Sequence, residues 1–451
     1  MRSALHPCSS AQIRGWLLLG LLATLTACDR ARSLGDRGFR SPRDEYVQAL
    51  EEADLHRTAV GRDWIAAGDA ALSVATHVSA PHREAVHLPA SEPRAVAWRV
   101  PLRRGDRLIA SAEVAMDPLG RLFIDLFSAP RDTTETYERV ASAPDGGTAI
   151  DVEIRRDGEY VLRAQPELLR GGRVVVTITT GPTLAFPVAG RDARIARSLF
   201  GAPRDAGRRS HHGVDLFAPR GTPVVAAAPG IVRRVGETDL GGNVVWLLDT
   251  RREQSLYYAH LDRQLVDAGD IVQVGDTLGL VGNTGNARST PPHLHFGIYR
   301  RGQGPVDPLP FIDTRRGTPP EITADTSLFG ARMRIARAQV VMRPSPRANG
   351  DSTRAVPRSA VLTVLGAAGG WLRVRLPGGE AGFVTATAVQ RLGAPITVVS
   401  REAGVVLRER PSPAAVIVDS LPSRARLSVL GRYGRWLLVA TEEKREGWIA
   451  E

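Results

Sequence analysis

Three short clusters in the middle of the chain carry imidazole and carboxylate side chains at spacings that suit a metal ion. His211 and Asp215 belong to an H-H-G-V-D run, and His293 and His295 belong to an H-L-H run. His260 lies between the two runs and follows a pair of tyrosines. Two imidazoles and one carboxylate make a three-ligand zinc site with an open fourth position. At such a position the metal can activate a water and polarise a carbonyl.

Strand periodicity explains how these side chains can reach one point. Side chains at positions i and i+2 of a strand project from the same face, so His293 and His295 project together, as do His211 and Asp215. Short apolar runs between glycine turns surround the clusters and predict an antiparallel sheet domain over residues 190–312. A further histidine beside the metal would be placed to accept a proton or to stabilise an oxyanion.

The H-x-G-x-D and H-x-H pair resembles the motifs of the zinc endopeptidases of the lysostaphin and LytM type. The resemblance implies a sheet domain of the duplicated hybrid motif type with zinc as its cofactor. It implies that the zinc ligands are His211, Asp215 and His295. It also implies catalytic roles for His260 and His293, as the base and oxyanion-stabilising pair beside the metal.

Two positions leave questions within this resemblance. His212 is an alternative first ligand, but the family spacing and the strand face shared with Asp215 favour His211. Gly297 stands where many members of the family carry glutamate after the H-x-H-F run. This difference bears on the peptide-binding groove and leaves the metal chemistry unchanged.

The resemblance implies a metalloendopeptidase that hydrolyses peptide cross-links of peptidoglycan through a zinc-activated water. The bond that is cut stays open between glycine bridges and links from D-alanine to a diamino acid. The alternative from another class is a catalytically silent envelope lipoprotein that activates a cell-wall amidase, since some proteins of this fold have lost their ligands. All five positions are filled here, which favours the enzyme.

The first 27 residues are typical of a secretion signal. Arg2 and Arg14 precede an apolar stretch, WLLLGLLATLTA, which is too short to span a membrane. The stretch runs into L-T-A-C, which resembles the lipobox of bacterial lipoproteins and implies cleavage before Cys28 and acylation of that residue. Several acyl chains give stable anchoring. We therefore expect a membrane-anchored lipoprotein of the bacterial envelope, on the periplasmic side of the inner or outer membrane; the alternative is an ordinary secretory signal.

The amino-acid composition limits which metal ligands and which partners are expected. The two cysteines are Cys8, in the signal, and Cys28, so a metal in the mature chain must be held by histidines and carboxylates. The net charge of +11 comes almost entirely from arginine, which suits a position near anionic phospholipid and wall polymers. No nucleic-acid motif accompanies the arginines, so nucleic acid is not expected as a partner. The expected partners are peptidoglycan, the membrane and an envelope regulatory protein.

The remaining sequence predicts a mainly β chain of several domains. An internal repeat near the C-terminus places Trp371 and Trp436 each 12 residues before a closing aromatic, Phe383 or Trp448. The two copies resemble bacterial Src-homology-three-like barrels, with a spacer role as the alternative. An enzyme that opens the wall should be restrained, and we expect the sandwich or the helices to be the segments that could cover its groove. The predicted order is signal 1–27, tether 28–41, helical segment 42–80, N-terminal β-sandwich 85–188, peptidase domain 190–312, linker 313–330 and small β-barrels at 331–393 and 395–451.

Overall fold

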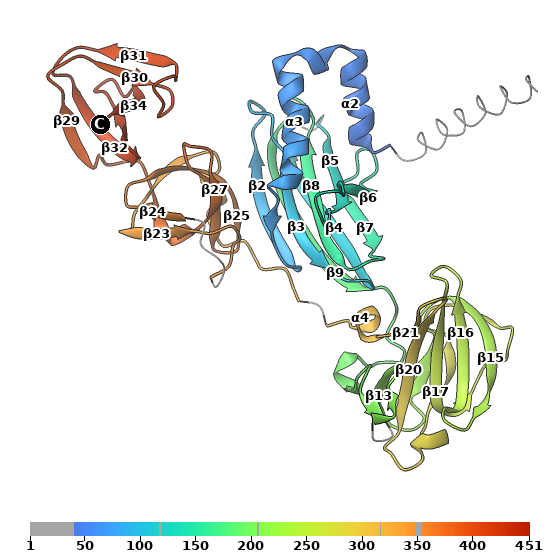
Figure 1. The fold of residues 1–451 in the computed structure, drawn as a ribbon. Coiled ribbons are helices and arrows are strands. Elements are labelled where there is room, and N and C mark those ends of the chain that lie inside the picture. The colour runs from blue at the N-terminus through green and yellow to red at the C-terminus, as the bar shows by residue number, and fades with distance from the viewer. Residues whose placement is uncertain (1–39, 117–119, 205–206, 316, 349–353) are drawn as a thin grey trace, which may run out of the picture.

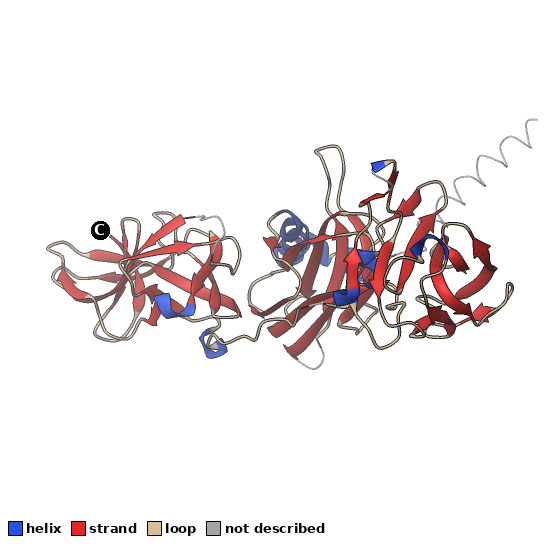
Figure 2. Ribbon diagram, turned by 90° about the horizontal axis from the view of Figure 1, so that it is seen from below, coloured by secondary structure: helices blue, strands red, loops and turns tan. Residues whose placement is uncertain are grey.

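The computed structural model describes residues 40–116, 120–204, 207–315, 317–348 and 354–451. Strands dominate these residues, as Figures 1 and 2 show, and the prediction of a mainly β chain is confirmed. The predicted signal peptide, the lipidation residue Cys28 and nearly all of the predicted tether lie outside the described residues. Within the described ranges, no helix combines the length and apolarity needed to cross a membrane.

Two helices begin the described chain and pack on a sheet (Figure 1). The first is capped by Ser41, whose hydroxyl accepts from the Asp44 N–H while the Asp44 carboxylate accepts from the Ser41 N–H. This reciprocal cap, with Pro42 in the first turn, fixes the start of the helix. The second helix buries Trp64, whose indole N–H donates to the Pro166 backbone oxygen over 2.8 Å. These elements are α2 (Pro42–Glu52), the 3-10 turn η1 (Leu55–Arg57) and α3 (Ala59–Ser73).

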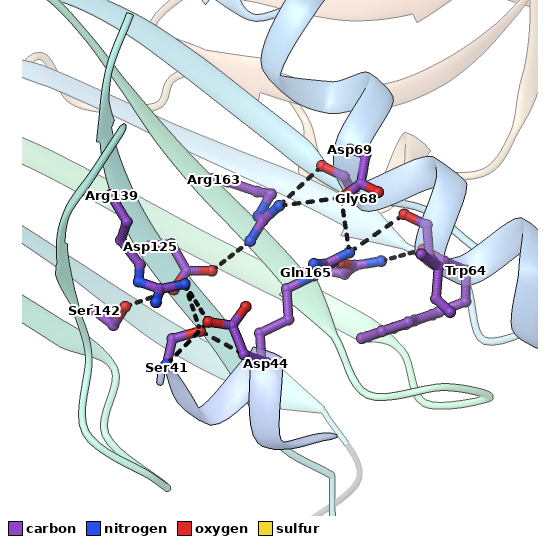
Figure 3. Close-up of polar contacts among 12 residues, drawn as sticks. Ser41, Asp44, Trp64, Gly68, Asp69, Asp125, Arg139, Ser142, Arg163 and Gln165 are labelled. Carbon is purple, nitrogen blue, oxygen red and sulfur yellow. Dashed lines mark hydrogen bonds and ion pairs between the residues drawn. The ribbon is translucent and has the colours of Figure 1, made fainter. Parts of the chain in front are cut away.

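A buried polar network fastens the two helices to the sheet (Figure 3). The Arg163 guanidinium donates to the Asp125 carboxylate over 2.7 Å and to the backbone oxygen of Gly68, in α3, over 3.2 Å. From α2, Arg43 donates to the side-chain oxygen of Gln165 over 2.7 Å. The side chains of Arg163 and Asp125 are 3% and 1% exposed. Their charges are therefore compensated by each other rather than by water.

Removing one partner of this pair should destabilise the chain. In Asp125→Ala the Arg163 charge stays buried without its carboxylate, and we expect the free energy of unfolding to fall by about 3–5 kcal/mol. Urea denaturation of the mature chain, followed by tryptophan fluorescence, measures the change. Asp69→Ala is the matched control, because Asp69 lies 3.8 Å from Arg163 but is 64% exposed. Asp69→Ala should lower the free energy of unfolding by less than about 1 kcal/mol. Equal losses of unfolding free energy in both variants would contradict the argument.

Below the helices, two sheets share one hydrophobic core. The core takes Trp98 and Leu162 from the first sheet and Leu108 and Val176 from the second. Side chains alternate between core and surface along the longer strands, as the two-residue period of a strand requires. The first sheet has the order β1 (Thr76–His77), β3 (Val96–Leu102), β8 (Gly158–Pro166), β5 (Leu122–Ser128), β6 (Glu138–Ser142). The second sheet includes β2 (His82–Leu88), β9 (Gly172–Pro182), β4 (Asp106–Met116) and β7 (Ala149–Glu153).

The second sheet continues into the C-terminal part of the chain, which the sequence did not predict. Strand β25 (Val361–Ala368) pairs with β2 through Ala85 opposite Ala367 and Val86 opposite Gly366. The resulting sheet has nine strands. Gly366 permits the close approach, because a Cβ at this position would lie 2.6 Å from the Ala85 backbone oxygen.

A buried ion pair supports this junction. Glu84 of β2 is fully buried and accepts from the Arg373 guanidinium and from the Trp98 indole. Burial by itself would raise the pKa of Glu84, but Arg373 and His82 outweigh burial and lower that pKa to about 2. The carboxylate is therefore charged at neutral pH, and it ties the C-terminal part of the chain to the sheet.

The two C-terminal repeats have matching strands. In each copy a long strand carries a bulge at the matched glycine, Gly366 or Gly431, and leads into two antiparallel strands. No sheet in the described part of these repeats closes on itself. The first copy contains β22 (Arg332–Ile335), β23 (Gln339–Met342), β24 (Arg354–Pro357), β25, β26 (Trp371–Arg375), β27 (Ala381–Thr385), η6 (Ala386–Ala388) and β28 (Val389–Arg391). The second contains β29 (Thr397–Ser400), β30 (Val405–Arg408), β31 (Ile417–Leu421), β32 (Arg426–Tyr433), β33 (Trp436–Ala440) and β34 (Glu446–Ala450).

The central domain is built on a ten-stranded sheet with its own core, and all of its strand pairings are antiparallel. In Figure 1 it lies at the end of the paired sheets opposite the helices, which therefore do not cover it. Its strands are β10 (Ala196–Ser198), β13 (Val214–Phe217), β14 (Pro223–Val225), β15 (Gly230–Thr238), β16 (Gly242–Asp249), β17 (Gln254–Gln264), β18 (Ile271–Val272), β19 (Thr277–Val281), β20 (His293–Arg300) and β21 (Gly304–Val306). Shorter elements are η2 (Ala193–Ile195), the hairpin β11 (Pro203–Arg204) and β12 (Arg209–Ser210), η4 (Gly285–Ala287), α4 (Leu309–Ile312) and, in the linker, η5 (Thr326–Leu328).

Candidate metal centre

Three neighbouring strands bring the predicted site residues together. Strand β20 lies between β13 and β17, and its His295 is directly opposite Asp215 on one side and Ala259 on the other. His211 comes just before β13 and reaches the same point. Gly213 leaves room for this arrangement, since a Cβ there would lie 2.7 Å from the His295 ring. The H-x-G-x-D motif therefore requires glycine at this position for a steric reason.

The three predicted ligand atoms form a triangle with equal sides. The distances are 3.0 Å from His211 Nε2 to Asp215 Oδ1, 3.0 Å from His211 Nε2 to His295 Nδ1, and 3.0 Å from His295 Nδ1 to Asp215 Oδ1. Zinc binds nitrogen and oxygen ligands at about 2.0–2.2 Å, which places tetrahedral ligands roughly 3.3 Å apart. The residues therefore fit a zinc ion in both type and spacing.

Backbone carbonyls fix the orientation of three of the four imidazoles. The Nδ1–H of His211 donates to the Leu199 oxygen, that of His260 to the Thr284 oxygen, and that of His293 to the Pro291 oxygen, each over 2.9 Å. A carbonyl only accepts, so each ring carries a proton on Nδ1, and in the neutral form of such a ring Nε2 is the nitrogen that can bind a metal or accept a proton. Such outer contacts hold a ligand or a base in the tautomer that its role requires.

His260 and His293 lie beside the triangle. His293 Nε2 is 3.9 Å from Asp215 Oδ1, and the His260 ring centre is 5.0 Å from that of His293 and 5.9 Å from that of His295. His260 has a φ of 62°, a left-handed conformation that costs a residue with a side chain some free energy. The Gly241 backbone oxygen, which accepts from the His260 N–H over 2.7 Å, holds this backbone in place.

Burial and mutual contacts set the charges of the cluster. Burial would raise the pKa of Asp215, but hydrogen bonds and charges of His211 and His295 lower it far below its usual range. Burial lowers the pKa of His260 to about 4, with a further contribution from His293, and it lowers the pKa of His295 as well. At neutral pH Asp215 is therefore a carboxylate and His295 a neutral imidazole, which are the forms that bind a metal, and His260 is neutral as well.

The structure also places the two positions that the sequence left in question. His211 is buried in the cluster, whereas His212 is exposed. Gly297 lies opposite Tyr257, and a Cβ on it would lie 3.0 Å from the Tyr299 ring. A larger side chain at this position would crowd Tyr299 and the His212 backbone oxygen, which lies 3.1 Å from the same Cβ position.

Two features beside the cluster were missed in the sequence. Trp246, Tyr257 and Tyr299 form an aromatic group whose ring centres are 4.4 to 6.1 Å apart, and Tyr257 also contacts the His295 ring edge-on. The two-residue period from His295 to Tyr299 could have placed it on this face. The second feature is Arg204, whose Nη2 donates to the outer oxygen of Asp215. No motif contains it.

Comparisons with known proteins point to the same region. The model of peptidase family M23 matches residues 209–308. The L-Ala–D-Glu endopeptidase of Bacillus subtilis is 35% identical over 139 residues, which are 28% of this chain and 42% of that protein. The peptidoglycan DD-endopeptidase ShyC of Vibrio cholerae is 41% identical over 97 residues, 21% of each protein. The chain thus spans less than half the length of either relative.

Among solved structures, the catalytic domain of lysostaphin from Staphylococcus simulans is 33% identical and covers 26% of this chain and 89% of that one, with a TM-score of 0.24. All five histidine and aspartate positions of the site lie inside the matched segment. The chain therefore carries a peptidase domain of family M23 over residues 209–308.

Proposed function

We propose that this chain is a zinc metalloendopeptidase that hydrolyses peptide cross-links of peptidoglycan. The observation that carries the proposal is the 3.0 Å triangle of His211, Asp215 and His295 with two oriented imidazoles beside it. The names of the relatives support the substrate class, because the Bacillus subtilis and Vibrio cholerae proteins are both endopeptidases and the second is named for peptidoglycan.

The triangle would hold the zinc, which supplies Lewis acidity to activate a water and polarise the scissile carbonyl. The other roles belong to the chain. The Nδ1–H groups of His260 and His293 donate to backbone carbonyls, so in the neutral ring Nε2 is the free acceptor, and one of the two rings would accept the proton that the attacking water loses. Once protonated, this nitrogen donates to the oxyanion or to the departing amine. The backbone carbonyls of Thr284 and Pro291 keep both rings in place during the transfer.

The aromatic group beside His295 supports a peptide-binding role for the same face. Trp246, Tyr257 and Tyr299 are each partly exposed and adjoin the cluster. Half-buried aromatic rings offer flat apolar surface with polar edges, which suits an extended peptide. Burial raises the pKa of Tyr257 and of Tyr299, so both hydroxyls stay protonated and can donate.

We propose that the other segments place this domain in the cell envelope. The lipobox at Cys28 would anchor the chain to the periplasmic side of the inner or outer membrane through its acyl chains. The two sheets that share a core would form a β-sandwich, and the C-terminal repeats would form Src-homology-three-like modules on the peptidoglycan side. The silent amidase activator is less well supported, because a protein that has lost catalysis has no need for three ligands and two fixed imidazoles.

Digestion of purified peptidoglycan sacculi tests the proposed function. The chain without residues 1–28 is incubated with sacculi, with and without a chelator, and the released fragments are identified by mass. We expect cross-link fragments that disappear with the chelator and return when zinc is added. If zinc binds in a one-to-one ratio and no peptide bond is cut, the proposed function is wrong. If zinc does not bind, the alternative function, activation of a cell-wall amidase, replaces the proposed one.

A further inference from the structure

Arg204 lies at the edge of the metal cluster in a position that the mechanism above does not use. It belongs to the β11–β12 hairpin, which runs directly into His211. Its Nη2 donates to Asp215 Oδ2 over 2.5 Å and to Ser198 Oγ over 2.8 Å. The other oxygen of Asp215, Oδ1, faces His211 and His295. One carboxylate therefore separates the guanidinium from the metal position.

Arg204 has donors left for a ligand. A guanidinium carries five N–H groups in a planar fork, and among the described residues only Nη2 of Arg204 has partners. The side chain is 37% exposed, which leaves it accessible to a ligand beside the metal cluster. The fork matches a carboxylate in shape and binds it through two parallel hydrogen bonds.

With the metal bound, the charge around this point would be positive. Zinc would bring two positive charges and Asp215 brings one negative charge, so the Arg204 guanidinium beside Asp215 would add to a site that is already cationic. A partly desolvated cationic site favours an anionic group and is less favourable for a neutral one. The guanidinium is close enough to the metal for this anionic group to belong to a residue next to the scissile bond.

We propose that Arg204 binds a free carboxylate on the residue that supplies the amine of the scissile bond. This inference rests on the proposed function and assigns the class of cross-link. A link from D-alanine to diaminopimelate has such a free carboxylate, because the carbon that bears the linked amine also bears a carboxylate. A glycine bridge has none, because each glycine carboxyl within it forms a peptide bond. Arg204 is then a specificity-determining residue, and the chain cuts the link from D-alanine to diaminopimelate.

Two peptide dimers that differ at one group provide the test. Both contain the D-alanine–diaminopimelate link; one has the free carboxylate beside the amine, and the other has a carboxamide there. The wild-type chain should cut the carboxylate dimer with a kcat/KM about 10- to 100-fold higher, the scale of a charged hydrogen bond. In Arg204→Ala this preference should vanish through a higher KM for the carboxylate dimer, while Arg204→Lys keeps part of it.

Controls separate recognition from structure. Arg194→Ala removes a 78% exposed arginine of the same domain that pairs with Asp192, and it should keep the full preference. Zinc content is measured for every variant. If the wild-type chain cuts both dimers equally, or if Arg204→Ala slows both by the same factor, the inference is wrong and Arg204 only supports Asp215.

Failure of the proposed function gives a different result. In that case zinc-loaded wild-type chain cuts neither dimer. Calorimetric binding of the two uncut dimers then decides the inference. Tighter binding of the carboxylate dimer that is lost in Arg204→Ala supports it, and equal binding overturns it.

Discussion

Replacing Asp215 by alanine should abolish peptide hydrolysis and remove the zinc. The substitution deletes the one charged ligand of the triangle and leaves His211 and His295 without the oxygen that both approach at 3.0 Å. We expect kcat/KM on cross-linked peptide to fall by about 10³-fold or more, the scale of losing a central catalytic group. Atomic emission should find less than one zinc per chain at a zinc concentration that saturates the wild type.

The control for this variant is Asp262→Ala. Asp262 lies two residues after His260, is 37% exposed and pairs with Arg220, so its loss should leave zinc content and activity near those of the wild type. Circular dichroism checks that both variants are folded. An Asp215→Ala chain that is folded and keeps zinc with full activity would rule out the proposed ligand set.

Replacing His260 should slow the chemical step while zinc stays bound. His260 is outside the triangle, with its ring centre 5.9 Å from that of His295, so the variant loses a proton acceptor and keeps all three ligands. General acid–base catalysis contributes about 10²- to 10⁴-fold, and we expect kcat to fall by that factor with little change in KM. Single-turnover cleavage of the carboxylate dimer measures it.

The choice of substitution matters because His260 has a left-handed backbone. Asparagine tolerates this conformation better than alanine does, so His260→Asn separates the loss of the imidazole from backbone strain. His212→Ala is the matched control, since this histidine is exposed beside the site. If His212→Ala loses zinc and His260→Asn stays active, the roles proposed for the histidines are wrong.

The candidate site could be predicted from the sequence because its geometry is local. The spacing of His211 and Asp215, and of His293 and His295, needs only the two-residue period of a strand, and one sheet register then brings the clusters together. The backbone of His260 could not be predicted, since nothing in its side chain favours a positive φ. It follows from irregular pairing of β17 with its neighbours.

Contacts between distant segments could not be predicted from the sequence, for another reason. Arg204 lies in a two-residue strand, too short to show a period, and its partner is set by how a hairpin folds back on β13. Glu84 and Arg373 are each ordinary surface residues by composition, and only the pairing of β2 with β25 buries them. A single sequence contains no signal for such pairs.

The pairing of β2 with β25 also hides two surfaces that would invite self-association. Along one edge of β25, residues 361–363 pair with β22, and Gly366 and Ala367 pair with β2. Unpaired N–H and C=O groups along a strand edge are a template for another copy of the chain. Here β2 and β25 each cover part of the other's edge, so backbone groups that would otherwise be open to another copy are paired within the intact chain.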